Sequence, residues 1–276
     1  MNRQLYKTEQ IFSIVIAVLA TIASLGGLGL KNLYRDNAFV KAAWFTNDMI
    51  TLAVAVPLLI IAVIQSKRGS LKWMLIWVGL LGYMFYNLGF YLLGAAFNLF
   101  FLIYTFLFSL SGFTMLKLLW NLSNEPLAQQ FSERVPVKTI SLYLLLMPLM
   151  LFIAELSMII PFITSGKIPE TIIATGHPTS VVFALDFSII IPAFTTAAVL
   201  LWQRKAWGYI LATMMPVKGF TYGLVLSIGT AFLAYDKAYG KWDPLMPLYA
   251  ALTLGGLPGC WFLLKTYKSN PESKAI

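Results

Sequence analysis

Charge, cysteine and histidine are all scarce in this sequence. Only 11% of its 276 residues are charged, whereas about a quarter is usual in a soluble domain. One histidine, His177, and one cysteine, Cys260, cannot supply an intrachain disulfide, the usual zinc site or paired haem ligands. P-loop, Rossmann and serine-nucleophile motifs are also absent. We therefore expect no metal and no cofactor, and no motif favours an enzyme.

Long apolar runs take the place of charge. Hydrophobic residues make up 59% of the chain, and the mean hydropathy is +0.78. A helix of roughly 20 apolar residues crosses the hydrocarbon of a bilayer and satisfies its own backbone there. The sequence therefore predicts an all-α, polytopic membrane helical bundle in contact with the lipid bilayer. We expect eight transmembrane helices, over residues 11–30, 45–64, 73–93, 97–116, 139–161, 181–202, 209–233 and 245–264.

The net charge of +9 indicates a membrane orientation rather than a nucleic-acid partner, because the basic residues cluster at the ends of the spans. If the N-terminus is inside, 13 of the 20 Lys and Arg lie on that side and six on the other, with Lys218 within a span. Lys and Arg accumulate on the cytoplasmic side of membrane proteins. We therefore expect both termini in the cytoplasm (N-in/C-in) and the protein in the inner (plasma) membrane.

A weak internal repeat is also visible. Pro57 in the second span and Pro192 in the sixth lie 135 residues apart, and both spans end in basic residues. This offset would divide the single transmembrane domain into two parallel four-helix halves, 1–135 and 136–276. Some transporters contain such halves, related by an axis along the membrane normal. The alternative is coincidence, since proline and basic ends are common in membrane spans.

Three ionisable residues fall within the expected spans: Glu155 in the fifth, Asp186 in the sixth and Lys218 in the seventh. A charge at the bilayer centre costs roughly 2.5–3.5 kcal/mol on insertion scales, so such residues usually face the bundle interior. At about 1.5 Å of helix per residue, they could meet in the outer half of the bundle. Their formal charges sum to −1, which a proton or cation would neutralise. The alternatives are a structural ion pair of Lys218 with either carboxylate, or an Asp186 wetted by the outer interface.

Prolines lie inside the same three spans. Each removes one helical hydrogen bond and frees the carbonyl four residues earlier. Transporters use broken helices to present backbone groups to ligands, although proline is common in membrane helices generally. The residues concerned are Pro148, Pro192 and Pro216.

Polar aromatic residues accompany these charges. Tyr83, Asn87 and Tyr91 follow one another at intervals of four residues in the third span, so they share a helical face. They could form a wall of a polar cavity, or they could only make hydrogen bonds between helices. Tyr222, four residues after Lys218, is a further candidate for ligand or ion binding.

Several residues near the outer ends of spans have simpler interpretations. Asn47 and Asp48 fit the N-cap of the second span, and Asp48 could also join an outer vestibule. Residues 31–44 mix apolar and charged side chains, which is typical of a short surface helix. His177, just before the sixth span, suits either a pH-sensitive gate or an ordinary loop position.

About a third of the chain resembles a group of uncharacterised bacterial multi-pass membrane proteins. No activity is attached to this group, so the resemblance implies a bacterial inner-membrane setting and nothing about mechanism. It does not extend to Glu155. The similar stretches are Asp48–Pro57, Gly82–Asn87, Phe90–Asn98, Asp186–Pro192 and Trp207–Gly219.

Three functions fit these observations. The first is a small transporter or ligand-binding protein, with Asp186 and Lys218 as its polar centre and Glu155 as a carrier of a proton or cation. The second is a non-catalytic assembly or sensory partner whose charges only pair with one another. The third is an intramembrane lipid-modifying enzyme, which would need a carboxylate beside a groove open to the bilayer. The sequence names no substrate and no protein partner.

Overall fold

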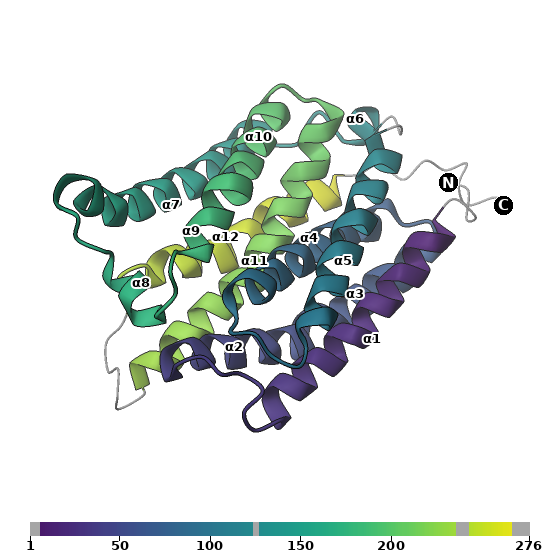
Figure 1. The fold of residues 1–276 in the computed structure, drawn as a ribbon. Helices are drawn as coiled ribbons and strands as arrows, with labels where there is room; N and C mark the ends of the chain where they lie inside the picture. The colour runs from purple at the N-terminus through teal and green to yellow at the C-terminus, as the bar shows by residue number, and fades with distance from the viewer. Residues whose placement is uncertain (1–5, 124–126, 236–242, 267–276) are drawn as a thin grey trace.

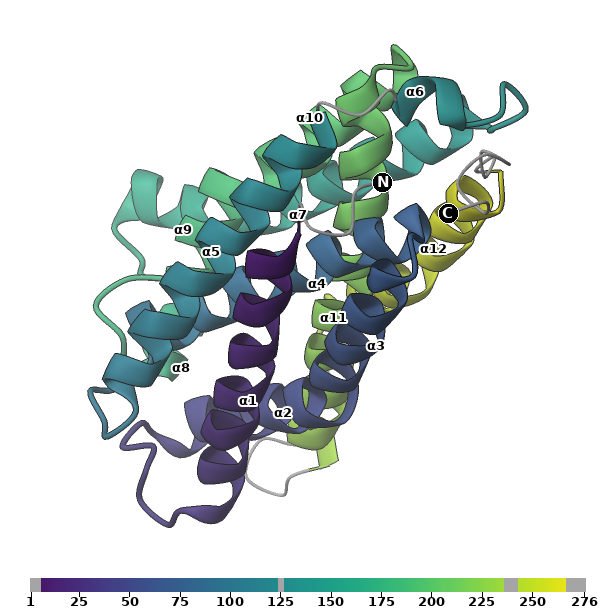
Figure 2. The same cartoon turned by 90° about the vertical axis from the view of Figure 1, so that its right-hand side faces the viewer.

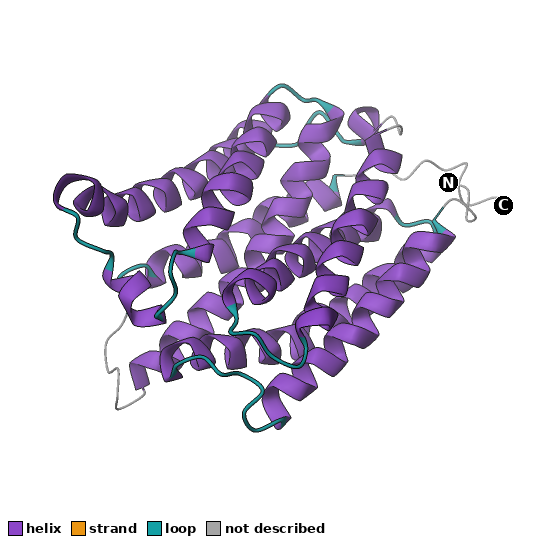
Figure 3. Cartoon of the chain, in the orientation of Figure 1, coloured by secondary structure: helices purple, strands orange, loops and turns teal. Residues whose placement is uncertain are grey.

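The computed structural model describes residues 6–123, 127–235 and 243–266, and all regular secondary structure within them is helical (Figure 3). Among these residues, eight continuous helical segments are long and apolar enough to cross a membrane, which confirms the eight expected spans. The first four spans are α1 (Lys7–Gly29), α2–η1–α3 (Ala38–Ile50, Thr51–Ala55, Val56–Lys67), α4 (Leu71–Gly94) and α5 (Phe101–Ser123). The last four are α7 (Val137–Ser165), α9–η2–α10 (Val181–Leu185, Asp186–Ile190, Ile191–Trp202), α11 (Ala206–Tyr235) and α12 (Met246–Lys265).

Two short helices lie outside the spans. The helix α6 (Leu127–Gln130) lies between α5 and α7, and α8 (Glu170–Thr175) lies between α7 and α9 (Figure 1). The first residue of α1 and the last residue of α12 lie at the end of the bundle that carries α6, whereas α8 lies at the opposite end (Figures 1 and 2).

The start of the second span differs from the sequence-based expectation. Residues 38–44 are not a separate surface helix, because they begin α2 and bury Val40 and Trp44. The N-cap is Asn37, whose side-chain oxygen accepts a hydrogen bond from the Val40 N–H at 3.0 Å. The prediction that Asp48 caps this helix is therefore wrong, and Asp48 lies well inside the span.

The helices α4 and α11 pack against each other in the middle of the bundle (Figures 1 and 2). Most residues of α4 are buried all around the helix. Large exposed apolar side chains occur instead along α1, α5, α7 and α12. Contiguous apolar surface of this extent is unusual on a soluble monomer and suits contact with lipid. The polar residues discussed below lie on the inward faces around α4 and α11.

Each of two spans contains one π-helical turn, η1 and η2, placed immediately before a proline. The Val56 N–H bonds to the carbonyl of Thr51, and the Ile191 N–H bonds to that of Asp186, five residues back in each case. The next residues are Pro57 and Pro192. A proline ring clashes with the carbonyl four residues earlier in an α-helix. The wider turn provides room for the ring without breaking the span.

The segments after these turns match in detail. The helices α3 and α10 both have 12 residues, and each begins 135 positions from the other. The hairpin that follows each helix has one residue with positive φ, Gly69 at 83° and Arg204 at 54°. The next helices, α4 and α11, begin two residues later. The packing is also similar, because α1 contacts α3 as α7 contacts α10, and α2 contacts α11 as α9 contacts α4.

Candidate functional site

A hydrogen bond between α4 and the start of η2 anchors a polar cluster inside the bundle. The Tyr86 hydroxyl donates to Oδ1 of Asp186 over 2.8 Å, and both residues are buried. Burial of Asp186 excludes the alternative in which the outer interface wets this carboxylate. Tyr86 was not a sequence-based candidate, although it lies next to the predicted stripe on the third span.

The Lys218 ammonium packs on aromatic rings. Its Nζ lies 3.7 Å from the centroid of the Tyr86 ring and 4.5 Å from that of Tyr222, and the two rings meet edge to face at 4.8 Å. Such cation–π contacts favour a buried cation. Within the described residues, no oxygen of Asp186 or Glu155 lies within 4.0 Å of this nitrogen, so the direct ion pair considered above is not formed. Lys218 and Asp186 still attract each other electrostatically.

Glu155 completes the cluster from α7. It is buried, and its carboxyl group is close enough to that of Asp186 for direct interaction. Its Oε2 has no conventional hydrogen-bond donor. The three ionisable residues predicted to meet therefore do lie together: Asp186 interacts directly with Glu155 and electrostatically with Lys218. We refer to Tyr86, Glu155, Asp186, Lys218 and Tyr222 as the charged centre.

Local structure places the charges at special points of their helices. Asp186 is the first residue of η2, and its own carbonyl accepts the wide-turn hydrogen bond. Lys218 follows Pro216, yet α11 continues as one helix, and α7 also continues through Pro148. The prolines of α7 and α11 therefore do not divide their spans. Of the three prolines in the spans that carry these charges, only Pro192 is accompanied by a change of helix type.

Two predicted site residues belong to a different cluster. The Tyr83 hydroxyl is 2.8 Å from Oγ1 of Thr51, and the Asn87 side-chain N–H donates to the same oxygen at 3.3 Å. Both residues therefore face η1 rather than the charged centre. Tyr83 and Tyr222 are near enough to interact electrostatically, so the two clusters adjoin across α4 and α11.

Asp48 is the acidic member of this second cluster. Its Oδ2 accepts a 2.6 Å hydrogen bond from the Tyr34 hydroxyl, and its Oδ1 accepts one of 2.9 Å from Tyr91. The Tyr91 ring stacks on Trp44 at 4.6 Å, which fixes the hydroxyl in place. Sequence analysis missed this site because Asp48 was placed at a helix end. The available signal was Tyr91, on the same helical face as Asn87.

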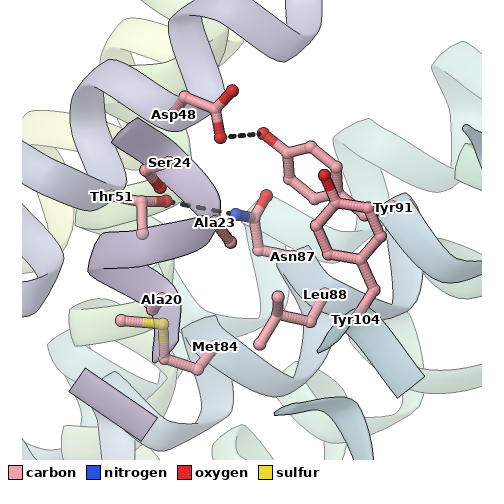
Figure 4. A pocket seen from close by; sticks show the side chains of 10 residues that line it. All are labelled: Ala20, Ala23, Ser24, Asp48, Thr51, Met84, Asn87, Leu88, Tyr91 and Tyr104. Atoms are coloured by element: carbon pink, nitrogen blue, oxygen red, sulfur yellow. Dashed lines mark hydrogen bonds between the residues drawn. The ribbon is translucent and has the colours of Figure 1, made fainter. Parts of the chain in front are cut away.

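A small cavity adjoins this cluster, and Figure 4 shows its lining. Its volume is about 10 Å³, which is room for one water-sized species. The amide oxygen of Asn87 has no hydrogen-bond partner, and the picture shows it turned into the space below Asp48 (Figure 4). We call this space the Asp48 cavity. It is lined by Ala20, Ala23, Ser24, Asp48, Thr51, Met84, Asn87, Leu88, Tyr91 and Tyr104.

The loops above the Asp48 cavity are tied together. Nε2 of His177 lies 3.7 Å from Oδ1 of Asp36, and the same Asp36 carboxylate accepts hydrogen bonds from the Ala96 N–H and from Nε1 of Trp44. The side-chain N–H groups of Asn37 donate to backbone carbonyls at the end of α8. The acidic neighbour of His177 is therefore Asp36 rather than Asp186.

One further buried acid lies at the opposite end of the bundle. Glu9 in the first turn of α1 pairs with Lys117 of α5, with Nζ 3.2 Å from Oε1, and accepts a 3.3 Å hydrogen bond from Asn121. The Lys117 side chain is 52% exposed, so this pair lies at the edge of the membrane span. We regard it as a link between α1 and α5. The sequence-based span began after Glu9 and therefore omitted it.

No known protein family, curated protein or solved structure matches this chain. The resemblance to uncharacterised bacterial membrane proteins gains no support from these comparisons. The described part of the chain is helical and contains eight helices long and apolar enough to span a membrane, which is compatible with a multi-pass membrane protein. Its function is inferred from its own residues.

Proposed function

We propose that this chain is a small plasma-membrane transporter whose charged centre takes up and releases one proton. The contact between the carboxyl groups of Glu155 and Asp186 carries the proposal. Two ionised carboxylates side by side repel each other strongly where water is excluded. The single ammonium of Lys218 balances only one of them. A proton shared by the two carboxyl groups makes the cluster neutral, and a small cation bound there would do the same.

The surroundings of the centre support transport over a purely structural role. Ionisable residues inside membrane spans commonly mark ion pathways and proton relays. Asp186 also lies in a π-helical turn, and such turns frequently occur at functional sites. A cluster that only joined helices would be served by a direct ion pair, and Lys218 makes none within 4.0 Å among the described residues.

The proposal includes an architecture and an orientation. The matched turns, hairpins and packing support two parallel halves, 1–135 and 136–276, as in transporters built from parallel repeats. The excess of Lys and Arg on one side supports both termini in the cytoplasm. Asp186 and Asp48 then lie in the outer part of the membrane.

Infrared spectroscopy of the full chain in lipid nanodiscs tests the shared proton, because a protonated carboxyl group absorbs separately from ionised carboxylates. The difference between wild type and Glu155→Gln at neutral pH should contain one protonated-carboxyl band. In wild type this band should shift when H₂O is replaced by D₂O, since a transported proton must exchange with solvent. Asp186→Asn should also change the band.

The matched control is Glu170→Gln, because Glu170 is an exposed glutamate of α8 outside the spans. Its difference spectrum should lack the band. If the protonated-carboxyl band of wild type were unchanged in the Glu155→Gln variant, the proposal of a shared proton would be overturned. A band that is present but does not exchange with D₂O would overturn uptake and release, and would favour the structural role of an assembly partner.

A further inference from the structure

We propose that the Asp48 cavity binds one monovalent metal cation of about the size of a water molecule. The site is separate from the charged centre. The proposal does not depend on proton transport, because different residues form the two sites.

Asp48 supplies a negative charge without a positive partner. Its two oxygens accept hydrogen bonds from the hydroxyl groups of Tyr34 and Tyr91, as an ionised carboxylate can. Among the described residues, no Lys, Arg or His nitrogen lies within 4.0 Å of it. A buried charge is costly unless it is paired, and hydrogen bonds offset only part of this cost. A cation beside Asp48 would neutralise the site.

Asn87 supplies an unused oxygen aimed at the same space. Its side chain is 2% exposed, and its N–H group donates to Thr51. This bond turns the amide oxygen away from Thr51 and into the Asp48 cavity, where the oxygen has no partner (Figure 4). A buried acceptor without a donor costs about 1–3 kcal/mol, so a cation or a water molecule at this point is favoured.

The lining selects the class of ion. Five of the residues that line the cavity carry side-chain oxygen atoms, which are the ligands that suit hard cations: Ser24, Asp48, Thr51, Asn87 and Tyr104. One carboxylate balances one positive charge. No group of three or more His, Cys, Asp or Glu occurs in the described residues, so the usual donor set for a divalent or transition metal is not present there. A water molecule would satisfy Asn87 but would leave the charge of Asp48 unbalanced.

The size of the cavity limits its occupant. Tyr34, in the loop between α1 and α2, donates a hydrogen bond to Asp48. The volume of about 10 Å³ admits one dehydrated ion and nothing larger. A dehydrated alkali ion held by a carboxylate and neutral oxygens is therefore the occupant that satisfies both charge and space.

Thermal unfolding of the full chain in nanodiscs tests the proposal. NaCl, KCl and LiCl are each compared with choline chloride at constant ionic strength, since choline is too large for the cavity. One of the small ions should raise the unfolding midpoint of wild type by about 2–4 °C at five times its Kd, and above the Kd the rise should grow with the logarithm of the ion concentration. Asp48→Asn should lose this rise.

Two further variants make the result decisive. Asn87→Ala keeps the Asp48 carboxylate and removes one ligand, so the same rise in unfolding midpoint should require at least a tenfold higher concentration of the same ion. This variant tests the site even if Asp48→Asn folds poorly. Asp186→Asn disrupts the charged centre and should keep the full rise. If no small ion differs from choline in wild type, or if Asn87→Ala responds as wild type does, the cavity holds only water and the proposal is overturned.

Discussion

Tyr86 uses two parts of its side chain in the charged centre. Its hydroxyl bonds to Asp186, and the face of its ring receives the Lys218 ammonium. The opposite charges are thereby linked through an aromatic ring rather than by direct contact. This arrangement leaves one side of the Asp186 carboxylate available to Glu155. The meeting of two acids and one base therefore depends on a residue that carries no charge itself.

Gly27 of α1 allows the close approach that the Asp48 site requires. A Cβ added at this position would overlap the Asp48 carboxylate and the Tyr34 hydroxyl. We expect Gly27→Ala to lower the free energy of unfolding by about 1–3 kcal/mol, the usual cost of overpacking. Thermal unfolding measures it, with Gly29→Ala as control, because a Cβ at Gly29 meets no atom within 4 Å. Equal effects of the two substitutions would contradict the prediction.

Tyr34 lies outside the spans, and its burial should make the free energy of unfolding fall as the pH rises into the alkaline range. Burial, and next the charge of Asp48, raise the pKa of Tyr34 well above its ordinary value of 10.0. Above pH 10 the unfolded chain loses a proton that the folded chain keeps, so the contribution is complete below pH 10 and falls above it. Tyr34→Phe should show a shallower alkaline decline in unfolding midpoint. Parallel curves for wild type and variant would count against this.

The positions of single residues were predictable where their depth in the membrane could be counted from the ends of an apolar run. Glu155, Asp186 and Lys218 were expected to meet from their positions in apolar runs, and they do. Asp48 was misplaced because the start of its helix depends on the Asn37 cap and on burial of Trp44. The cap is a local hydrogen bond, but the burial of Trp44 depends on contacts with distant segments, which spacing alone does not encode.

At the scale of elements, each of the two π-helical turns directs a polar side chain towards the interior of the bundle. In each, the residue whose carbonyl accepts the wide-turn bond also presents its side chain to the neighbouring helix, Thr51 towards α4 and Asp186 towards Tyr86. The extra residue in the turn shifts the helical register ahead of the proline. The side chains before and after Pro192 therefore face directions that a regular helix would not give.

A one-residue deletion tests this role of η2. Removing Ser188, an exposed residue of the turn, should restore an α-helical register and rotate Asp186 by about 100° relative to α10. Asp186 would then leave Tyr86 and Glu155. The protonated-carboxyl band should disappear while helix content by circular dichroism stays unchanged. Deletion of Ile168, exposed in the loop before α8, is the control and should leave the band in place.

The spans themselves followed from composition, because only helices satisfy their backbone within a bilayer. Their ends were less predictable. Helix α5 extends to Ser123, beyond the expected end at residue 116, because its last turns pack on neighbouring helices despite their polar residues. The π-helical turns were not predicted. Proline indicated that the α-helical hydrogen bonding of the second and sixth spans is interrupted. Whether the interruption is a kink or a π-helical turn depends on how the neighbouring helices pack.

At the scale of the whole molecule, the two clusters would occupy corresponding places in the proposed parallel halves. An offset of 135 residues relates each member of the charged centre except Tyr86 to a residue that lines the Asp48 cavity or, for Lys218, to Tyr83, which bonds to Thr51 of the lining. In three of the four pairs, the residue in 1–135 is neutral and the residue in 136–276 is charged. This correspondence supports the proposed parallel halves and explains why the two clusters adjoin across α4 and α11. The pairs are Ala20 and Glu155, Thr51 and Asp186, Tyr83 and Lys218, and Asn87 and Tyr222.

The orientation of the chain across the membrane decides which compartment each site faces. Labelling of introduced cysteine residues measures this orientation. The background is Cys260→Ser, which removes the free, buried native thiol. Glu170 and Glu133 are exposed and lie beyond opposite ends of α7, whose 29 residues span about 43 Å. Their replacement by cysteine gives matched probes.

With both termini in the cytoplasm, a membrane-impermeant maleimide should label Glu170→Cys in intact cells. It should label Glu133→Cys only after the membrane is opened. The reverse pattern would invert the proposed topology. Tyr34 and the Asp48 cavity would then face the cytoplasm, and a cation would reach Asp48 from the inside. The labelling experiment therefore fixes the direction in which both sites exchange with water, independently of what they bind.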